Sequence, residues 1–415
     1  MRARVGHRVG LMFYLGRQAG GAPFFTSDRS HLLVLGPPRS GKTSSLVIPN
    51  ARLFPGAVVV TSTKNDILDA ILVRRREVGT VWVFDPSGEF PLPDGVCRAS
   101  WSPVAASVNL EEAVLVAEGF VAVALGTGSS ADRHWIDRAK ALLAPLLLAA
   151  QLSGVSASVV ASWIDRRDFA EALDSLQFSG EERAVEVLQG ILGTEARERS
   201  AIISSTSAAL AAYRFRDQQD GEEFVPSNFV VSQDLLLVVS PSLVQTVVAP
   251  VVVALLDEIR RAAYRSTAIG AEPKVALLLD EMANIAPLPS LGSLLSEGVS
   301  QGVYLLGALQ DLSQARERWP ALMRGLLTLF GTTVVLGGIG DIETLRMLEE
   351  LFGTIDHAEV GWQRGGFLRL TTSTHKVERP LFSRGELREL GPFEAAVLDL
   401  RGGSGKVRLT PDFLA

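Results

Sequence analysis

Residues 31–43 read His31-Leu32-Leu33-Val34-Leu35-Gly36-Pro37-Pro38-Arg39-Ser40-Gly41-Lys42-Thr43. An apolar run typical of a strand leads into Gly-x-x-x-x-Gly-Lys-Thr, the phosphate-binding loop pattern, at every fixed position. The residues that follow can open a helix. A strand, a glycine turn and a helix start form a concave anion site, because backbone N–H groups point inward and the helix dipole adds positive charge. The alternative is a chance glycine- and serine-containing loop before a helix. It does not explain why a strand-like run precedes the loop and a helix-forming run follows it.

The loop predicts a nucleotide site with Mg²⁺. Lys42 is expected to reach the β- and γ-phosphates and to act in catalysis, and Thr43 to ligate Mg²⁺. The predicted phosphate-binding residues from this loop are Gly36, Pro37, Pro38, Arg39, Ser40, Gly41, Lys42, Thr43 and Ser44.

A second apolar run ends in two adjacent acids. Residues 275–279 are followed by Asp280 and Glu281. In phosphate-loop ATPases such a pair places one carboxylate beside Mg²⁺ and the next beside the attacking water. We therefore assign Asp280 to the nucleotide-bound metal and Glu281 to the water. Gln310 ends the following strand and is a candidate sensor of the γ-phosphate. The alternative for Gln310 is a loop-capping residue.

The spacing of apolar runs predicts an α/β fold. Strand candidates are residues 31–35, 57–61, 81–84, 235–239, 275–279, 303–309, 332–336 and 395–398. Most are continuously apolar, as in parallel strands covered on both faces. Helical stretches between several of them favour a doubly covered, mostly parallel sheet.

One long interval lacks strand signals. Between residues 104 and 227 the pattern predicts helices at 110–117, 134–151, 167–176, 181–192 and 194–213. We therefore expect a motor domain formed by residues 1–104 and 228–415, interrupted by an all-α domain at 105–227.

Composition excludes several classes of protein. With a net charge of −6 and a pI of about 5.6, a broadly basic DNA-coating surface is not expected, although a narrow basic channel is compatible with it. The single Cys97 rules out an intrachain disulfide and a cysteine metal cluster and suits a reducing cytoplasm. The apolar runs at 141–150 and 246–256 each contain a proline and are about half the roughly 20 residues that a membrane crossing needs.

The motifs together resemble a known family. The loop and the Leu46-Val47-Ile48-Pro49-Asn50 run after it are similar to the coupling-protein ATPases of type IV secretion and conjugation (TraG/TraD type), in their actinobacterial branch. The similarity continues through residues 58–64, 81–88, 101–104, 278–289, 309–314, 330–332 and 337–341. Residues 280–289 are its most specific part.

The resemblance implies a RecA-like ATPase motor interrupted by an all-α domain. Such proteins are similar to hexameric DNA pumps of the FtsK/HerA kind, which bind ATP between subunits of a ring around DNA. The implied partners are DNA, a relaxase or effector proteins received by the all-α domain, and the components of a secretion channel. A homo-hexamer is expected, with a monomer in isolation as the alternative.

Two departures from the family pattern follow. Relatives commonly begin with transmembrane helices, and this chain shows none. The chain is then a natural form without an anchor, a motor whose anchor is another subunit, or a trimmed chain. We expect it at the cytoplasmic face of the membrane, associated through its partners. Many relatives also carry a basic element whose arginine reaches the neighbour's ATP, whereas residues 296–302 contain no base. Arg316, Arg318 and Arg138 are the remaining candidates for that role.

Three functions remain open from the sequence. The leading hypothesis is an ATP-hydrolysing coupling protein that moves DNA or a DNA–protein cargo. The others are a nucleotide-switched adaptor that recruits protein without pumping DNA, favoured by the missing base and the acidic pI, and a DNA translocase unrelated to secretion.

Several other residues have two interpretations each. The run Arg74-Arg75-Arg76 predicts either contacts to DNA phosphates or, more simply, a solvated helix face. Residues 362–367 predict either a DNA-contacting loop or a hairpin tip. Lys64, Asp85 and Glu89 lie in loops that follow two strands. They are predicted to contact the nucleotide or a neighbouring subunit. The alternative for Asp85 is that it caps local structure. His134 and Trp135 favour packing over chemistry.

Overall fold

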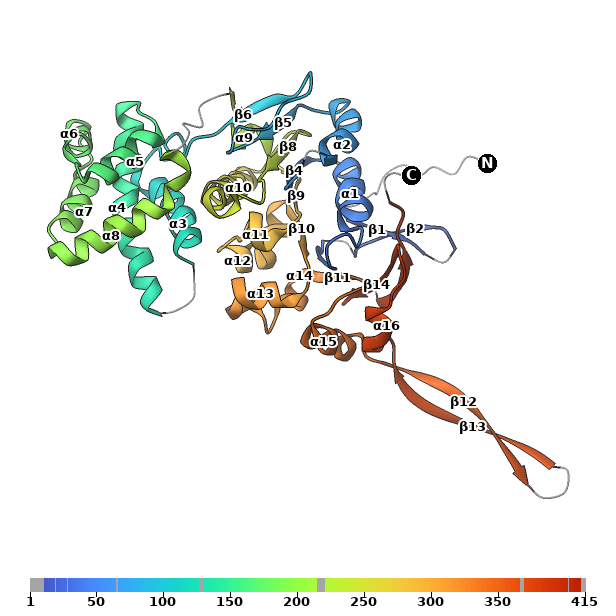
Figure 1. Ribbon diagram of the computed structural model, residues 1–415. Coiled ribbons are helices and arrows are strands. Elements are labelled where there is room, and N and C mark those ends of the chain that lie inside the picture. Colours follow the sequence, from blue (N-terminus) through green and yellow to red (C-terminus); the bar gives the residue numbers. More distant parts are fainter. Residues whose placement is uncertain are drawn as a thin grey trace.

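The computed structural model describes residues 11–411 except 19, 28, 65, 127–129, 215–220, 366–368 and 402. A 13-stranded sheet runs through the body of the molecule in the order β2-β1-β15-β14-β11-β3-β10-β9-β4-β8-β5-β6-β7 (Figure 1). Its strands are β1 Tyr14–Arg17, β2 Pro23–Phe25, β3 His31–Leu35, β4 Ala57–Ser62, β5 Val81–Phe84, β6 Cys97–Ser100, β7 Glu222–Glu223, β8 Leu235–Val239, β9 Val275–Leu279, β10 Val303–Leu309, β11 Gly331–Leu336, β14 Glu394–Asp399 and β15 Gly403–Arg408.

The sheet is parallel from β11 to β7 and antiparallel from β11 through β14, β15 and β1 to β2. Strands β3, β8, β9 and β10 are buried at every residue, because their apolar side chains are covered on both faces. The predicted mixed α/β fold with a mostly parallel sheet is confirmed.

Two hydrophobic layers cover the sheet. One face packs against α1 (Ile48–Leu53) and α2 (Asp66–Arg76). The other face packs against α10 (Gln245–Ala268), α12 (Leu291–Glu297) and α14 (Leu326–Phe330), and this layer continues into a separate group of helices.

That group of helices occupies the interval in which no strand was expected. It comprises α3 Leu110–Leu125, α4 Ser130–Ser153, α5 Ala157–Arg166, α6 Ala170–Phe178, α7 Glu182–Leu192 and α8 Ala196–Ala209, which form one end of the molecule in Figure 1. Helix α3 packs on α10, where Gly119 lies against Ala254 and allows close approach. The sequence pattern missed α5, and it missed the short strand β7 at the end of the interval.

The remaining helices are short and connect strands of the sheet. They are α9 Pro226–Phe229, α11 Met282–Ile285, α13 Leu312–Arg318, α15 Ile342–Phe352 and α16 Arg384–Arg388. Among the helices of the described residues, none combines the length and the apolar character needed to cross a bilayer.

A long hairpin projects from the opposite end of the body (Figure 1). It consists of β12 (Thr354–Gly365) and β13 (Arg369–Pro380), which pair only with each other. Of the candidate segment 362–367, residues 362–365 end strand β12, and residues 366 and 367 lie outside the described part of the chain.

Candidate nucleotide-binding site

The glycine loop joins β3 to a helical turn at Thr43–Val47 that continues into α1. The backbone N–H of Gly36 donates to the carbonyl of Leu309 at 3.1 Å. A Cβ at Gly36 would lie 2.7 Å from Ser40 Oγ, and Gly41 has a φ of +92°, in the region that favours glycine. Both glycines are therefore required by the shape of the loop.

Strand order brings the acidic pair to this loop. β10 pairs with both β3 and β9, so the ends of these three parallel strands are neighbours. Thr43 Oγ1 donates to Asp280 Oδ2 at 2.6 Å, and Thr61 Oγ1 donates to the backbone carbonyl of Asp280 at 2.9 Å. The two residues predicted to hold Mg²⁺ are thus in direct contact, although they are 237 positions apart.

Glu281 has an unusual backbone conformation. Its φ of 52° and ψ of 46° are left-handed, a region that a non-glycine residue occupies at a cost of roughly 1–3 kcal/mol. Its carbonyl accepts from the N–H groups of Asn284 and Ile285, which fixes it at the start of α11. Such strain is concentrated at functional sites, where the surrounding structure maintains it.

The Lys42 ammonium lies over the loop. Its Nζ donates to the carbonyl oxygens of Gly36 at 2.5 Å and Pro37 at 2.9 Å. Burial lowers the pKa of Lys42, and the nearby carboxylates of Asp280 and Glu281 oppose that shift. The cation is therefore held beside the two acids, where a phosphate chain would compete for it.

These side chains line one cavity of 350 Å³. Lys42, Thr43, Asp280, Glu281 and Gln310 all lie in its wall, so the structure brings together every residue predicted for metal binding, water activation and γ-phosphate sensing. The other lining residues are Pro38, Arg39, Ser62, Thr63, Lys64, Ala308, Leu309 and Gln314.

Some cavity residues had only a weak signal in the sequence. Lys64 follows β4, which pairs with β9, so its place at the cavity follows from strand order. Gln314 was missed. Its Oε1 accepts from the backbone N–H of Gln310 at 2.8 Å. Gln314 lies in the 309–314 stretch of the family resemblance, but no role at the site was assigned to it.

Other candidates lie elsewhere. Asp85 accepts from the N–H groups of Ser87 at 2.9 Å and Phe90 at 2.7 Å, and so caps its own loop. Glu89 does not line the cavity. His134 and Trp135 lie on α4, with their ring centroids 5.2 Å apart, and neither residue lines the nucleotide cavity.

Two of the three arginines considered for a neighbour's ATP are held in ion pairs within the chain. Arg316 pairs with Asp341 at 2.5 Å, and Arg138 pairs with Glu198 at 2.8 Å. Arg318 is exposed at the end of α13.

The structure corrects the prediction for one residue of the triple-arginine run, whereas Arg74 and Arg76 are exposed on α2, as a solvated helix face predicts. Arg74 pairs with Glu77 at 2.5 Å, but the Arg75 side chain is buried. Neither a DNA contact nor a solvated helix face describes Arg75.

The parallel sheet, the glycine loop and the converging acids define a P-loop ATPase fold with a helical insertion. The family model for type IV secretory system conjugative DNA transfer matches residues 4–399, and the chain belongs to this family. The coupling-protein family predicted from the motifs is thereby confirmed.

Solved structures share the fold. The bacterial conjugative coupling protein TrwBdeltaN70, in an unbound form, has a TM-score of 0.73 at 17% identity, over 98% of this chain and 90% of its own. The plasmid coupling protein TrwB in complex with ADP and Mg²⁺ has a TM-score of 0.71 at 18% identity, over 96% and 89%. VirB4 of Thermoanaerobacter pseudethanolicus has a TM-score of 0.53 at 13% identity, over 99% and 98%. A search of curated protein sequences gave no match.

Proposed function

We propose that this protein hydrolyses ATP with Mg²⁺ and uses the energy to move DNA, with or without bound protein, toward a type IV secretion channel. The observation that supports this most is the convergence of Lys42, Thr43, Asp280, Glu281 and Gln310 on one cavity. Membership of the conjugative DNA transfer family supports the nature of the cargo.

Each residue has a proposed role. Lys42 would exchange its loop carbonyls for the β- and γ-phosphate oxygens. Glu281 would accept a proton from the attacking water, and Gln310 would contact the γ-phosphate or that water.

The donor set fits Mg²⁺. The Thr43 hydroxyl and the Asp280 carboxylate are hard oxygen ligands already in contact, and they would hold the ion. When bound, Mg²⁺ supplies positive charge that offsets the phosphate oxygens. The TrwB structure, which holds ADP and Mg²⁺, supports a Mg²⁺-bound nucleotide at this site.

We further propose a ring of six copies at the cytoplasmic face of the membrane, with the helices of residues 105–227 receiving a relaxase or effector. A second candidate function is an adaptor that uses nucleotide only to control assembly. It is favoured by the absence of a base from residues 296–302 and by the ion pairs that already hold Arg316 and Arg138.

The catalytic assignment predicts the effect of two substitutions. Lys42→Ala and Glu281→Gln should each lower the ATPase rate by about 10²-fold or more, because they remove the phosphate-binding cation and the proton acceptor. Steady-state phosphate release measures the rate, and the midpoint of urea unfolding should stay unchanged.

Matched controls lie at the opposite end of β9, where Lys274 and Glu272 are exposed. Lys274→Ala and Glu272→Gln should retain the wild-type rate. Wild-type rates in Lys42→Ala and Glu281→Gln as well would reject the assignment of the site.

A further inference from the structure

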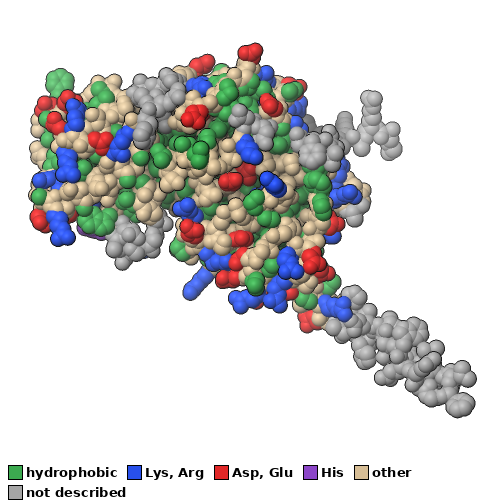
Figure 2. All heavy atoms as spheres, in the orientation of Figure 1, with side chains coloured by type: hydrophobic (Ala, Val, Ile, Leu, Met, Phe, Trp, Pro, Cys, Tyr) green, Lys and Arg blue, Asp and Glu red, His purple; other side chains and the backbone are tan. Residues whose placement is uncertain are grey.

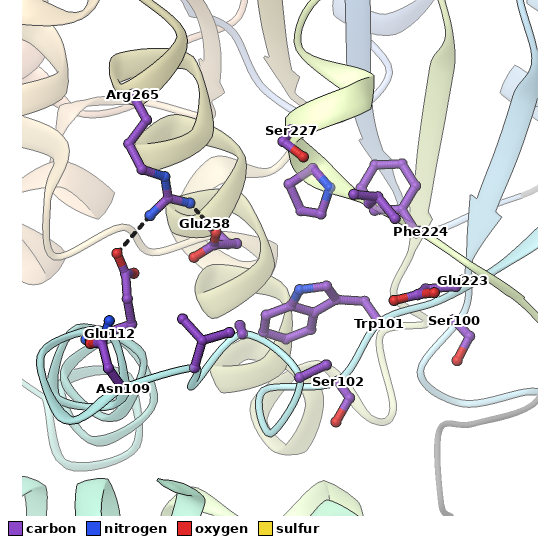
Figure 3. Close-up of a pocket in the computed structure, with 15 residues that line it drawn as sticks. Ser100, Trp101, Ser102, Asn109, Glu112, Glu223, Phe224, Ser227, Glu258 and Arg265 are labelled. Carbon is purple, nitrogen blue, oxygen red and sulfur yellow. Dashed lines mark hydrogen bonds and ion pairs between the residues drawn. The ribbon is translucent and has the colours of Figure 1, made fainter. Parts of the chain in front are cut away.

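A second cavity, of 510 Å³, lies where the chain passes between the sheet and the helical group (Figure 3). Residues 100–109 lead from β6 into α3, and residues 223–227 lead back through α9 toward β8. Both segments line this cavity, and α10 closes it with Glu258 and Arg265. A ligand bound there would touch the entry to the helical group, the exit from it and the helix on which α3 packs.

The walls are mainly apolar and include two large aromatic side chains. Trp101 and Phe224 are buried, and the Trp101 ring projects across the cavity in Figure 3. At the mouth, Val108 is 62% exposed and Val225 is 37% exposed. One valine comes from each connecting segment, so an apolar rim remains open to solvent beside the aromatic floor.

The charged groups of the cavity are predominantly acidic. Glu112, Glu223 and Glu258 face a single lining cation, Arg265. Arg265 donates to Glu112 Oε1 at 2.8 Å and to Glu258 Oε1 at 2.5 Å, and Arg261 donates to Glu258 Oε2 at 2.6 Å. Glu258 is therefore satisfied at both oxygens.

The other two carboxylates are not satisfied in this way. Glu112 Oε2 is a buried atom with no hydrogen-bond partner among the described residues. A buried acceptor without a donor costs roughly 1–3 kcal/mol, so a ligand that donates there gains affinity. Glu223 is exposed at the edge strand β7, and it adds negative charge to the same mouth.

We propose that this cavity binds an extended peptide segment of a protein partner, in which an arginine or lysine alternates with apolar residues. One cation of the segment would pair with Glu112 and another with Glu223, which lie on opposite sides of the Trp101 ring in Figure 3. The apolar neighbours would cover Val108, Val225 and the Trp101 face. The volume is within the roughly 300–1,000 Å³ of ligand sites, and the apolar rim continues the surface beyond one side chain, as a peptide requires. This site is separate from the nucleotide cavity and does not depend on the proposed ATPase activity.

The test uses the full chain and a fluorescein-labelled pentapeptide, Leu-Arg-Val-Arg-Leu, with binding followed by fluorescence anisotropy. Replacing both arginines of the peptide by glutamine, or all its apolar residues by glycine, should each weaken binding about tenfold or more. Agmatine, a guanidinium on a short alkyl stem, should compete only at far higher concentration. Competition by agmatine at the concentration of unlabelled peptide would overturn the peptide assignment in favour of a small amine.

Substitutions in the chain locate the binding site. Glu112→Gln and Glu223→Gln should each weaken peptide binding about fivefold or more. Glu111→Gln is the matched control, because this substitution removes the same charge. Glu111 precedes Glu112 on α3 and does not line the cavity. Equal affinity in Glu223→Gln and wild type would overturn the proposal, and since Glu223 is exposed, this result is independent of any effect of Glu112→Gln on folding.

Discussion

Arg75 acts as a structural cross-link between α2 and the sheet. Its Nη1 donates to the Phe54 carbonyl at 3.0 Å, and its Nη2 donates to Gly56 at 2.8 Å, Gln233 at 2.6 Å and Asp234 at 3.1 Å. One guanidinium thus ties α2 to the segments that begin β4 and β8. Burial lowers the pKa of Arg75 to about 10, which leaves it charged at neutral pH.

The first residue-scale prediction concerns this cross-link. Arg75→Ala should lower the free energy of unfolding by about 3 kcal/mol or more, because buried carbonyl groups lose their donor and a cavity opens. Arg74→Ala removes only an exposed ion pair and should change stability by less than about 0.5 kcal/mol. Urea unfolding of the two variants measures the contrast, and similar midpoints would contradict the cross-link.

The second residue-scale prediction concerns His31, at the start of β3. Its Nδ1 accepts from the N–H of Leu305 at 3.0 Å, and burial lowers its pKa from 6.5 to about 4. The folded state therefore binds the proton more weakly than the unfolded state. The stability that neutral His31 contributes is complete above pH 6.5 and is lost as the pH falls from 6.5 toward 4.

As the pH falls through this window, the free energy of unfolding of the wild type should decrease by about 1.4 kcal/mol per pH unit relative to that of His31→Gln. The comparison of urea unfolding at pH 7.5, 6 and 5 measures it, because all other titrating groups are common to both chains. Parallel pH profiles of the two proteins would show that His31 does not titrate in this way.

At this scale the site was more predictable than the packing. A fixed loop spacing and an apolar strand ending in two acids identified Lys42, Thr43, Asp280 and Glu281, because this chemistry tolerates few alternatives. Arg75 had an unused signal. Ile67 and Ile71 are buried at i and i+4, and Arg75 continues the same helical face. The strained backbone of Glu281 had no signal, since it results from the junction of β9 and α11.

At the scale of elements, buried strands were predictable and edge strands were not. The strands β3, β5, β8, β9 and β10 have the expected bounds, because continuous apolar runs identify strands covered on both faces. The strand β6 reads Cys97-Arg98-Ala99-Ser100, and such a mixed composition resembles a loop. In the antiparallel extension, β14 was predicted at 395–398 from its apolar run, whereas β1, β2 and β15 were not, because their pairing depends on tertiary contacts that no local pattern contains.

The hairpin β12–β13 gives the prediction for this scale. Its strands pair only with each other, and the described base is held by the Phe352–Phe382 ring contact at 4.9 Å and by Leu381 N–H donating to Gly353. Asp356 pairs with Glu378, so residues 357–377 can be replaced by Asn-Gly, a two-residue hairpin turn.

The shortened chain should melt within about 3 °C of wild type, because the projecting part lies outside the body (Figure 1). Differential scanning calorimetry measures the change. A drop of 10 °C or more would show that the hairpin stabilises the body.

For the whole molecule, charge and architecture limit how DNA is held. The exposed face in Figure 2 intersperses basic and acidic side chains, and the net charge is −6. A single copy therefore presents no broad cationic surface on that face. The proposed ring would require each copy to contribute a few cations to a shared channel, so that several copies together hold the DNA.

This requirement couples DNA stimulation to assembly. At fixed low salt, single- or double-stranded DNA should raise the ATPase rate several-fold only at protein concentrations where light scattering with ATP reports a six-membered ring. The stimulation should fall steeply as salt increases, because each phosphate contact releases counterions. Lys42→Ala in the same assay controls for contaminating ATPase. A monomer in ATP whose rate is indifferent to DNA at every salt concentration would reject the motor and support the adaptor, because a subunit that never encloses DNA cannot convert hydrolysis into its movement.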